Sequence, residues 1–183
     1  MTITRSSLYC CLGFLLTCAL LQGQTQTSGA TEDSCRKFVQ QFYDWYLPQA
    51  KKQHSPSPGD IVVKYKSQSF SRELRMRLKE DSDAQARSRD LVGLDFDPFL
   101  NTQDPGFERC TVGKIVRKTA SYWAEVTCVF PGANAEKSKI MPELVLNEGR
   151  WLFVNFHYRE GAKAYDLLTM LKALREDRKP KSK

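Results

Sequence analysis

The chain has 183 residues, of which 41% are hydrophobic and 27% are charged, and its formal net charge is +7. This composition excludes a disordered or collagen-like chain and provides enough apolar material for one domain of ordinary size. Much of the excess positive charge lies at the C-terminus, where a solvated terminus is the more common arrangement and attraction to an acidic surface is the alternative. Nucleic acid is not expected as the partner, because the N-terminus predicts export.

The N-terminus has the pattern of a secretory signal peptide. Arg5 supplies a short basic region, and the apolar run LYCCLGFLLTCALL follows it at residues 8–21. A membrane-spanning helix needs roughly 20 apolar residues, so this run is too short to cross a bilayer. The polar segment behind it can be cut after Gly23 or Ala30, and we expect residues 1–30 to be a signal peptide and a polar linker. The protein is therefore predicted to be periplasmic or secreted.

Contact with a membrane is predicted at two places only. The sequence LLTC at residues 15–18 resembles a lipoprotein cleavage site, so Cys18 is an alternative site of lipidation, although Thr17 fits that motif poorly. The C-terminal residues 177–183 are basic, and we expect a disordered tail that is either solvated or attracted to an anionic surface.

Three cysteines follow the predicted signal peptide, namely Cys35, Cys110 and Cys128, and three cannot all pair within one chain. Cys110 and Cys128 flank a predicted hairpin, at positions that suit diagonal neighbours on two strands. A disulfide between them is one reading, and two buried thiols that pack as small hydrophobic side chains are the other.

Helical patterns occupy the first half of the remaining chain. Ser34 caps a predicted helix that carries a heavy aromatic stripe and ends at Pro48. A loop with two prolines and a glycine follows, in which His54 is expected to be solvated, and residues 61–66 fit either a short helix or a strand. Ser71 caps the next predicted helix.

The second half of the chain has the two-residue period of β-strands. We expect an antiparallel meander of four strands, at about residues 107–118, 122–130, 137–147 and 150–158. An amphipathic helix at residues 162–176 follows them. Helices followed by a curved antiparallel sheet predict a single α+β domain at residues 31–176, in which the helices cover one face of the sheet.

The loop at residues 94–105, LDFDPFLNTQDP, concentrates acidic and amide side chains between bulky apolar ones. In an EF-hand register Asp95 and Asp97 would be ligands, but Leu100 replaces the required glycine and Gly106 replaces the closing glutamate. We therefore predict neither a metal site nor a cofactor. Such residues more commonly form turns and caps, with Phe96, Phe99 and Leu100 packed into the core, which makes this loop a structural bridge from the helices to the sheet.

These segments together resemble the bacterial domain-of-unknown-function family DUF3828. The resemblance rests on FVQQFYDWYL, LVGLDFDPFLNTQDP, ELVLNEGRWLFVNFHY and the leucine-rich terminal helix, which occur in this order. That family is assigned to the nuclear-transport-factor-2-like superfamily, in which a bent antiparallel sheet wraps around helices to form a cone with a pocket at its open end. The resemblance implies a cone-shaped bacterial envelope protein. It implies no activity, because the superfamily includes enzymes, binding modules and scaffolds.

The last predicted strand carries the candidate site. Strict alternation places four side chains on one face, namely Trp151, Phe153, Asn155 and His157. If this face lines the cone, these residues form an aromatic-walled ligand pocket together with Tyr43 and Trp45 of the first helix. We therefore expect a non-enzymatic envelope module that binds an envelope protein or a small molecule through the pocket or its rim.

The alternative function is that of a small-molecule isomerase, dehydratase or hydrolase. His157 would act as the general base, and Asn155 would orient a polar substrate. Asp95 or Asp97 would fix the tautomer of the imidazole. This interpretation requires His157 to lie close to one of these two carboxylates.

Overall fold

The computed structural model describes residues 16–52, 57–132 and 137–179, so His54 lies outside the described residues. The chain divides into two compact units, Met1–Ser34 and Cys35–Lys183, and the sheet and its helical cover belong to the second. Within the described ranges, no helix combines the length and the apolar character that crossing a bilayer requires.

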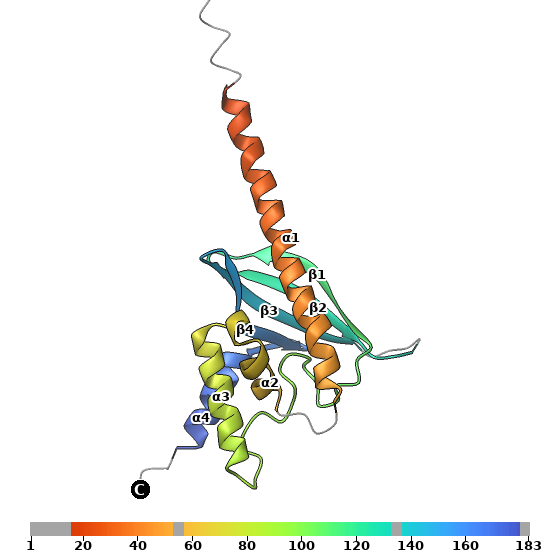
Figure 1. The fold of residues 1–183 in the computed structure, drawn as a ribbon, viewed down its shortest axis with the longest axis vertical. Helices are drawn as coiled ribbons and strands as arrows, with labels where there is room; N and C mark the ends of the chain where they lie inside the picture. The colour runs from red at the N-terminus through yellow and green to blue at the C-terminus, as the bar shows by residue number, and fades with distance from the viewer. Residues whose placement is uncertain (1–15, 53–56, 133–136, 180–183) are drawn as a thin grey trace, which may run out of the picture. The chain divides into compact units, whose positions relative to one another are not determined.

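The elements follow one another as helices and then strands, with a last helix at the C-terminus (Figure 1). The helical elements are α1 (Leu16–Ala50), α2 (Pro58–Tyr65), the 3-10 turn η1 (Ser67–Ser69), α3 (Arg72–Ala86) and α4 (Leu167–Asp177). The strands are β1 (Arg109–Arg117), β2 (Tyr122–Val129), β3 (Lys137–Asn147), β4 (Arg150–Glu160) and β5 (Lys163–Asp166). They form one antiparallel sheet in the order β1-β2-β3-β4-β5.

The predicted α+β class and the antiparallel meander are confirmed. The fifth strand, β5, was not expected, because its residues were assigned to the terminal helix. Asp166 ends β5 and caps α4, since its carboxylate accepts a 3.0 Å hydrogen bond from the backbone N–H of Thr169. The helix therefore begins at Leu167, several residues later than predicted.

The predicted start of α3 is confirmed, whereas the predicted start of α1 was wrong. Ser71 caps α3 as expected, because its hydroxyl accepts from the backbone N–H of Leu74 at 3.2 Å. The ambiguous segment 61–66 belongs mainly to α2, which Ser57 caps. In contrast, α1 begins at Leu16, and the hydroxyl of Ser34 donates to the carbonyl of Thr31 within the helix.

Pro48 does not end α1, which continues to Ala50. A proline this near the C-terminus of a helix removes one hydrogen bond without interrupting a long ladder. The next backbone N–H groups still find carbonyl partners, and that of Lys51 bonds to Leu47 at 3.3 Å.

A β-bulge in β4 reverses the predicted faces of this strand. Glu143 pairs with Asn155 and Leu144 pairs with Phe153, so Val154 has no partner in the ladder. The extra residue shifts the alternation by one position. Trp151 and Phe153 before the bulge and Phe156 and Tyr158 after it are all buried, whereas Asn155 and His157 are only partly covered. The prediction that His157 shares a face with Trp151 and Phe153 was therefore wrong.

Aromatic rings fill the space between the helices and the sheet. Phe42 of α1 lies 4.9 Å from Phe153 and 5.6 Å from Phe70, measured between ring centroids. Phe99 of the acidic loop packs against Phe156 at 5.1 Å. All five side chains are at most 4% exposed. The helix-facing side of the sheet therefore forms a packed core.

Of the two readings of Cys110 and Cys128, the structure shows the disulfide. The two residues lie directly opposite each other on β1 and β2, whereas the sequence suggested diagonal positions. Cys35 is fully buried in the core. On the outer edge of β1, the amide of Gln40 donates to the carbonyl of Cys110 and accepts from the backbone N–H of Val112, both at 3.0 Å. This side chain covers part of a strand edge that would otherwise remain open.

Of the basic tail predicted at residues 177–183, residues 180–183 lie outside the described residues, and within the described part Arg178 anchors the C-terminal end of α4. Arg178 donates to the buried carboxylate of Asp81 at 2.7 Å and to the carbonyl of Val92 at 2.9 Å. Asp81 also accepts from the backbone N–H of Leu94. Arg178 therefore connects α4, α3 and the acidic loop, although the sequence alone suggested a solvated basic residue.

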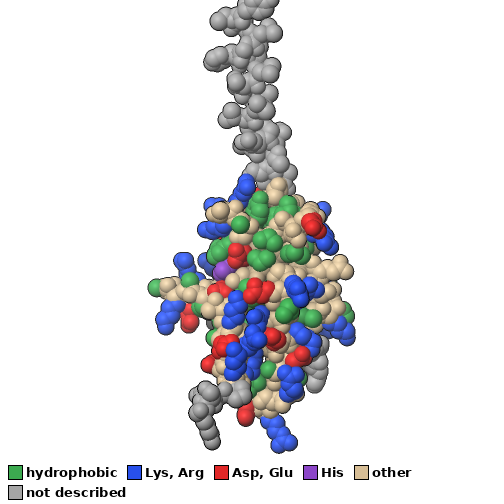
Figure 2. Space-filling model, turned by 90° about the vertical axis from the view of Figure 1, so that its left-hand side faces the viewer, with side chains coloured by type: hydrophobic (Ala, Val, Ile, Leu, Met, Phe, Trp, Pro, Cys, Tyr) green, Lys and Arg blue, Asp and Glu red, His purple; other side chains and the backbone are tan. Residues whose placement is uncertain are grey.

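The surface of α3 and α4 carries mixed charge. Lys172 pairs with Glu73 at 2.9 Å, and Glu80 accepts from Arg77 at 2.8 Å with Arg175 at 3.7 Å. Figure 2 shows basic and acidic side chains interspersed over one side of the molecule. These acidic partners balance part of the basic charge on the surface of α3 and α4.

Candidate functional site

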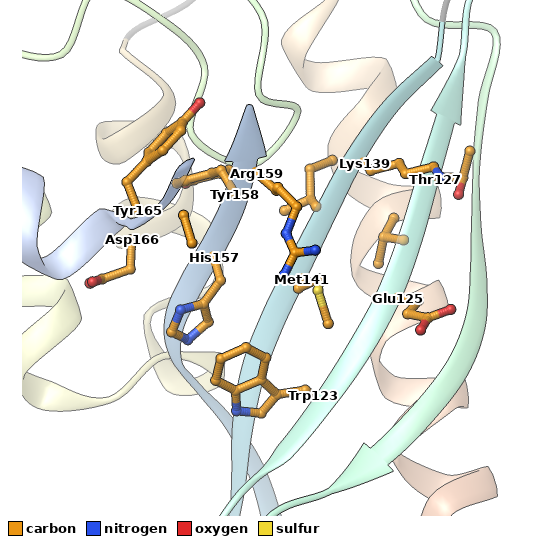
Figure 3. Close-up of a pocket in the computed structure, with 13 residues that line it drawn as sticks. Trp123, Glu125, Thr127, Lys139, Met141, His157, Tyr158, Arg159, Tyr165 and Asp166 are labelled. Carbon is orange, nitrogen blue, oxygen red and sulfur yellow. The ribbon is translucent and has the colours of Figure 1, made fainter. Parts of the chain in front are cut away.

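The sheet face that points away from the helices carries the candidate site. On β2, β3 and β4 the residues that alternate with the core positions project from this face, which we call the open face (Figure 3). The open face consists of Trp123, Glu125, Thr127, Lys139, Met141, Glu143, Asn155, His157 and Arg159. It contains a hollow of about 660 Å³, here called the main hollow, which Trp123, Met141 and His157 help to line.

Trp123, His157 and Glu143 form one contact cluster on the open face. The imidazole of His157 stacks on the indole of Trp123, with the ring centroids 3.9 Å apart and the planes inclined by 15°. Nε2 of His157 lies 2.8 Å from the carboxylate of Glu143, and the two side chains are 21% and 23% exposed. The cluster thus combines a flat aromatic surface with a histidine whose orientation an acidic side chain fixes.

Asn155 has a structural role beside this cluster. Its amide donates to Asp166 at 2.8 Å, and its side-chain carbonyl accepts from the backbone N–H of Leu168 at 3.0 Å. Partial burial raises the pKa of Asp166, but hydrogen bonds from Asn155 and Thr169 outweigh this, so that the pKa is lowered from its ordinary value. Asn155 therefore joins β4 to the start of α4, and its side-chain amide is engaged in this connection rather than directed at a substrate.

A second, smaller hollow adjoins the main one. Lys139 and Arg159 border both hollows. In the second hollow, of about 330 Å³, the other described lining residues are Asn101, Thr102, Phe107, Phe130 and Ser138. Figure 3 shows the side chain of Arg159 extending along the open face toward Met141. The two basic side chains therefore lie where the two hollows meet.

The acidic loop does not contribute to the open face. Asp97 is buried on the helix side, where it accepts from the hydroxyl of Tyr46 at 2.7 Å and from the backbone N–H groups of Phe99 and Leu100 at 2.8 and 3.1 Å. Burial raises the pKa of Asp97 to about 6, although these three hydrogen bonds act in the opposite direction. As predicted, the loop shapes a turn and inserts Phe99 and Leu100 into the core.

The structure therefore separates the residues of the predicted catalytic set. His157 lies on the open face with Glu143 as its acidic partner. Asp97 lies on the opposite side of the sheet with Tyr46, and the exposed Asp95 is approached by Gln103 at 3.5 Å. Neither aspartate fixes the imidazole of His157.

The predicted aromatic pocket is not formed either. Tyr43, Trp151 and Phe153 are buried core residues with exposed fractions of 1%, 8% and 0%. Trp45 is half-buried on the helix side, with the ammonium group of Lys66 4.9 Å from the centre of its ring. Of the six pocket candidates, only Asn155 and His157 lie on the open face. The described residues contain no cluster of three or more His, Cys, Asp or Glu side chains suited to a metal ion.

Sequence reasoning missed Trp123, Met141 and Glu143. A signal for Trp123 was present, because Trp123, Glu125 and Thr127 alternate with apolar residues along β2 and so share one face. The pairing of Glu143 with His157 had no such signal, since it depends on the register of β3 against β4 and on the bulge at Val154.

Comparison with known proteins supports the fold and gives no activity. No family model matches the chain, and no curated protein matches it. Among solved structures the chain is similar to a protein of unknown function from Bacteroides thetaiotaomicron VPI-5482, with a TM-score of 0.52 and 17% sequence identity. The match covers 74% of this chain and 98% of that one. The resemblance to DUF3828 stays a prediction, and the similarity to the Bacteroides protein is one of fold alone.

Proposed function

We propose that this protein is a non-enzymatic binding module that holds a small organic ligand on its open face. The single observation that carries the proposal is the main hollow of about 660 Å³, floored by Trp123, Met141 and His157. Small-molecule sites usually have volumes of about 300–1,000 Å³, apolar or aromatic walls and a few polar groups that fix orientation. The main hollow meets this description.

The choice of face follows from packing. The helix side of the sheet is filled by the aromatic core, so a ligand there would have to displace Phe42, Phe99 or Phe153. Removing one such side chain costs about 3–5 kcal/mol. On the open face a ligand displaces only solvent, and the basic side chains of Lys139 and Arg159 at one end of the hollow favour a ligand with a negative group.

The proposed site of action is the bacterial envelope. The short apolar run at residues 8–21 and the polar segment after it support export, and the resemblance to DUF3828 supports a bacterial cone-shaped domain. Fractionation of the producing cell and determination of the mature N-terminus test this part. A protein that stays in the cytoplasm with Arg5 still attached contradicts it.

Binding is tested with 2-naphthoate, a flat apolar ring system with one carboxylate. Calorimetric titration of the wild-type domain is expected to show one binding site. Trp123→Ala is expected to weaken the affinity at least about tenfold, because stacking of a flat ring on an aromatic side chain is worth about 1–3 kcal/mol. Trp45→Ala, which removes an indole from the helix side, is the matched control and should bind like the wild type. Equal loss in both variants, or no binding to the wild type, would refute the proposal.

A second candidate function rests on the 2.8 Å contact between His157 and Glu143. A histidine oriented by a carboxylate is the arrangement of a general base, so an isomerase, dehydratase or hydrolase would use this pair in place of the predicted aspartates. A panel of ester, epoxide and hydroxy-acid substrates tests this. Turnover that disappears in both His157→Gln and Glu143→Gln would favour an enzyme over a binding module.

A further inference from the structure

We infer that the second hollow is an anion subsite, in which Lys139 and Arg159 hold the carboxylate, sulfonate or phosphate group of an amphipathic organic ligand. The inference deepens the proposed function and rests on it, because it assigns the chemical class of the ligand and its orientation on the open face.

Lys139 and Arg159 are two like charges on the same face, and no described acidic side chain forms an ion pair with either. Met141 and His157 are paired across β3 and β4, and Lys139 and Arg159 occupy the next outward positions of the same two strands. Neighbouring like charges on a sheet repel each other, and an anion between them removes this cost.

The second hollow contains no competing carboxylate among its described lining residues. Apart from the two basic side chains, it is lined by two phenylalanines and by Asn101, Thr102 and Ser138, which are neutral and polar. An anion in this position therefore meets two positive charges, with neutral hydrogen-bonding groups close by. Arg and Lys side chains form charge-assisted hydrogen bonds with carboxylate and phosphate oxygens, and Arg can do so with two bonds at once.

The acidic side chains of the open face leave the basic pair available. Glu143 is bound to His157, and the carboxylate of Asp166 accepts from Asn155 and Thr169. Glu125 remains, and it lies across from Met141 on the far strand, β2. Glu125 lines the main hollow together with Lys139 and Arg159, whereas no described carboxylate lines the second hollow, so an anion meets the two cations without an acidic neighbour on that side.

The spacing along the strands sets the size of the ligand. Thr127 lies beside Lys139 and is four residues from Trp123 on β2, which corresponds to about 13 Å along a strand. Arg159 shortens this span, because its side chain reaches back toward Met141 (Figure 3). A ligand with an apolar ring system of about two rings and one anionic group reaches from the aromatic floor to the basic pair.

The test compares four probes with the same ring system and different charge: 2-naphthoate, naphthalene-2-sulfonate, 2-naphthalenemethanol and 2-naphthylmethylammonium. For the wild type we expect both anions to bind about tenfold more tightly than the neutral alcohol, and the cation to bind most weakly. In Lys139→Gln/Arg159→Gln the anions should fall to the affinity of the alcohol, while the alcohol itself is unchanged. Lys64→Gln/Arg72→Gln removes the same charge from the helix side and should behave like the wild type.

The outcomes separate this inference from the proposed function. If all four probes bind the wild type equally and Trp123→Ala weakens all of them, the open face binds ligands but the anion subsite is refuted. If the anion preference persists in Lys139→Gln/Arg159→Gln, or is lost equally in the helix-side double variant, the assignment to these two residues is refuted. If no probe binds, the proposed function itself fails.

Discussion

The imidazole of His157 lies against the indole of Trp123 at 3.9 Å, on the face of the sheet that the helices leave uncovered. This contact brings together a residue of β2 and a residue of β4 across the intervening β3. It exists because the bulge at Val154 turns His157 away from the core. The same bulge directs Phe156 and Tyr158 inward, so it decides which side chains of the second half of β4 face the core and which lie on the open face.

Truncation of Trp151 on β4 should cost much more stability than truncation of Trp123 on β2. Trp151 is 8% exposed and packs edge-on against Tyr122 at 5.0 Å, so Trp151→Ala is expected to lower the free energy of unfolding by about 3–5 kcal/mol. Trp123→Ala removes an outer side chain and should cost less than half as much stability while it weakens probe binding at least about tenfold. Urea unfolding of both variants, followed by circular dichroism, measures the difference. A larger loss of stability for Trp123→Ala would contradict the assignment of the two faces.

Asp97 should make stability depend on pH between its unfolded and folded pKa values. Because burial raises the pKa of Asp97 from 3.8 to about 6, the folded state binds more protons than the unfolded state in this window. The resulting stabilisation is complete below about pH 4 and is lost as the pH rises through 6, a change of about 3 kcal/mol. The free energy of unfolding of the wild type relative to Asp97→Asn should fall by nearly this amount between about pH 3 and about pH 7.

Asp95→Asn is the matched control for that experiment, because Asp95 is exposed in the same loop. A flat difference for Asp97→Asn would show that the buried carboxylate does not titrate in this window.

The disulfide should contribute measurably to stability. Cys110 and Cys128 are 18 positions apart, and closing a loop of this length in the unfolded chain is worth about 3 kcal/mol. Cys110→Ala/Cys128→Ala should lower the free energy of unfolding by this amount. A reducing agent should destabilise the wild type similarly and leave the double variant unchanged. If reduction affects both proteins equally, the bond is not the source of the effect.

Arg178 should stabilise the fold although it lies next to the chain terminus. Arg178→Ala leaves the carboxylate of Asp81 buried with less compensation and is expected to cost about 3 kcal/mol, the low end for a buried pair, because Arg178 is partly exposed. Lys179→Ala removes the adjacent exposed charge and should produce no measurable change. Adding Asp81→Asn to Arg178→Ala should restore part of the loss, because the variant then buries no charge. Equal effects of the two single variants would mean that residue 178 belongs to a solvated tail.

The elements of this fold could be predicted from local patterns, but the faces of β4 could not. Ser71, the turn residues and the alternating strands each act within a few residues, so the helix α3 and four strands were found. The bulge at Val154 depends on which β3 residues pair with β4, and this is decided by packing across the sheet. Because Val154 is unpaired, His157 lies on the open face and not on the wall of the expected pocket.

For the acidic loop, the structural role could be predicted but the side-chain contacts could not. Its sequence correctly indicated a structural bridge with Phe99 and Leu100 as core side chains. The partner of Asp97 was not predictable, because Tyr46 approaches from a helix that precedes it by 51 residues. The sequence identified His157 as a candidate site residue, but only the fold shows Glu143 beside it.

The most direct test of the open face is a titration of the ¹⁵N-labelled domain with 2-naphthoate, followed by NMR. The indole N–H of Trp123 is buried without a hydrogen-bond partner among the described residues, so its resonance reports on the floor of the main hollow. We predict that the shifts concentrate on Trp123, Met141, His157, Lys139 and Arg159, while the indole resonances of Trp45 and Trp151 stay in place. Shifts centred on Trp45 and Tyr43, or none at saturating probe, would contradict the account.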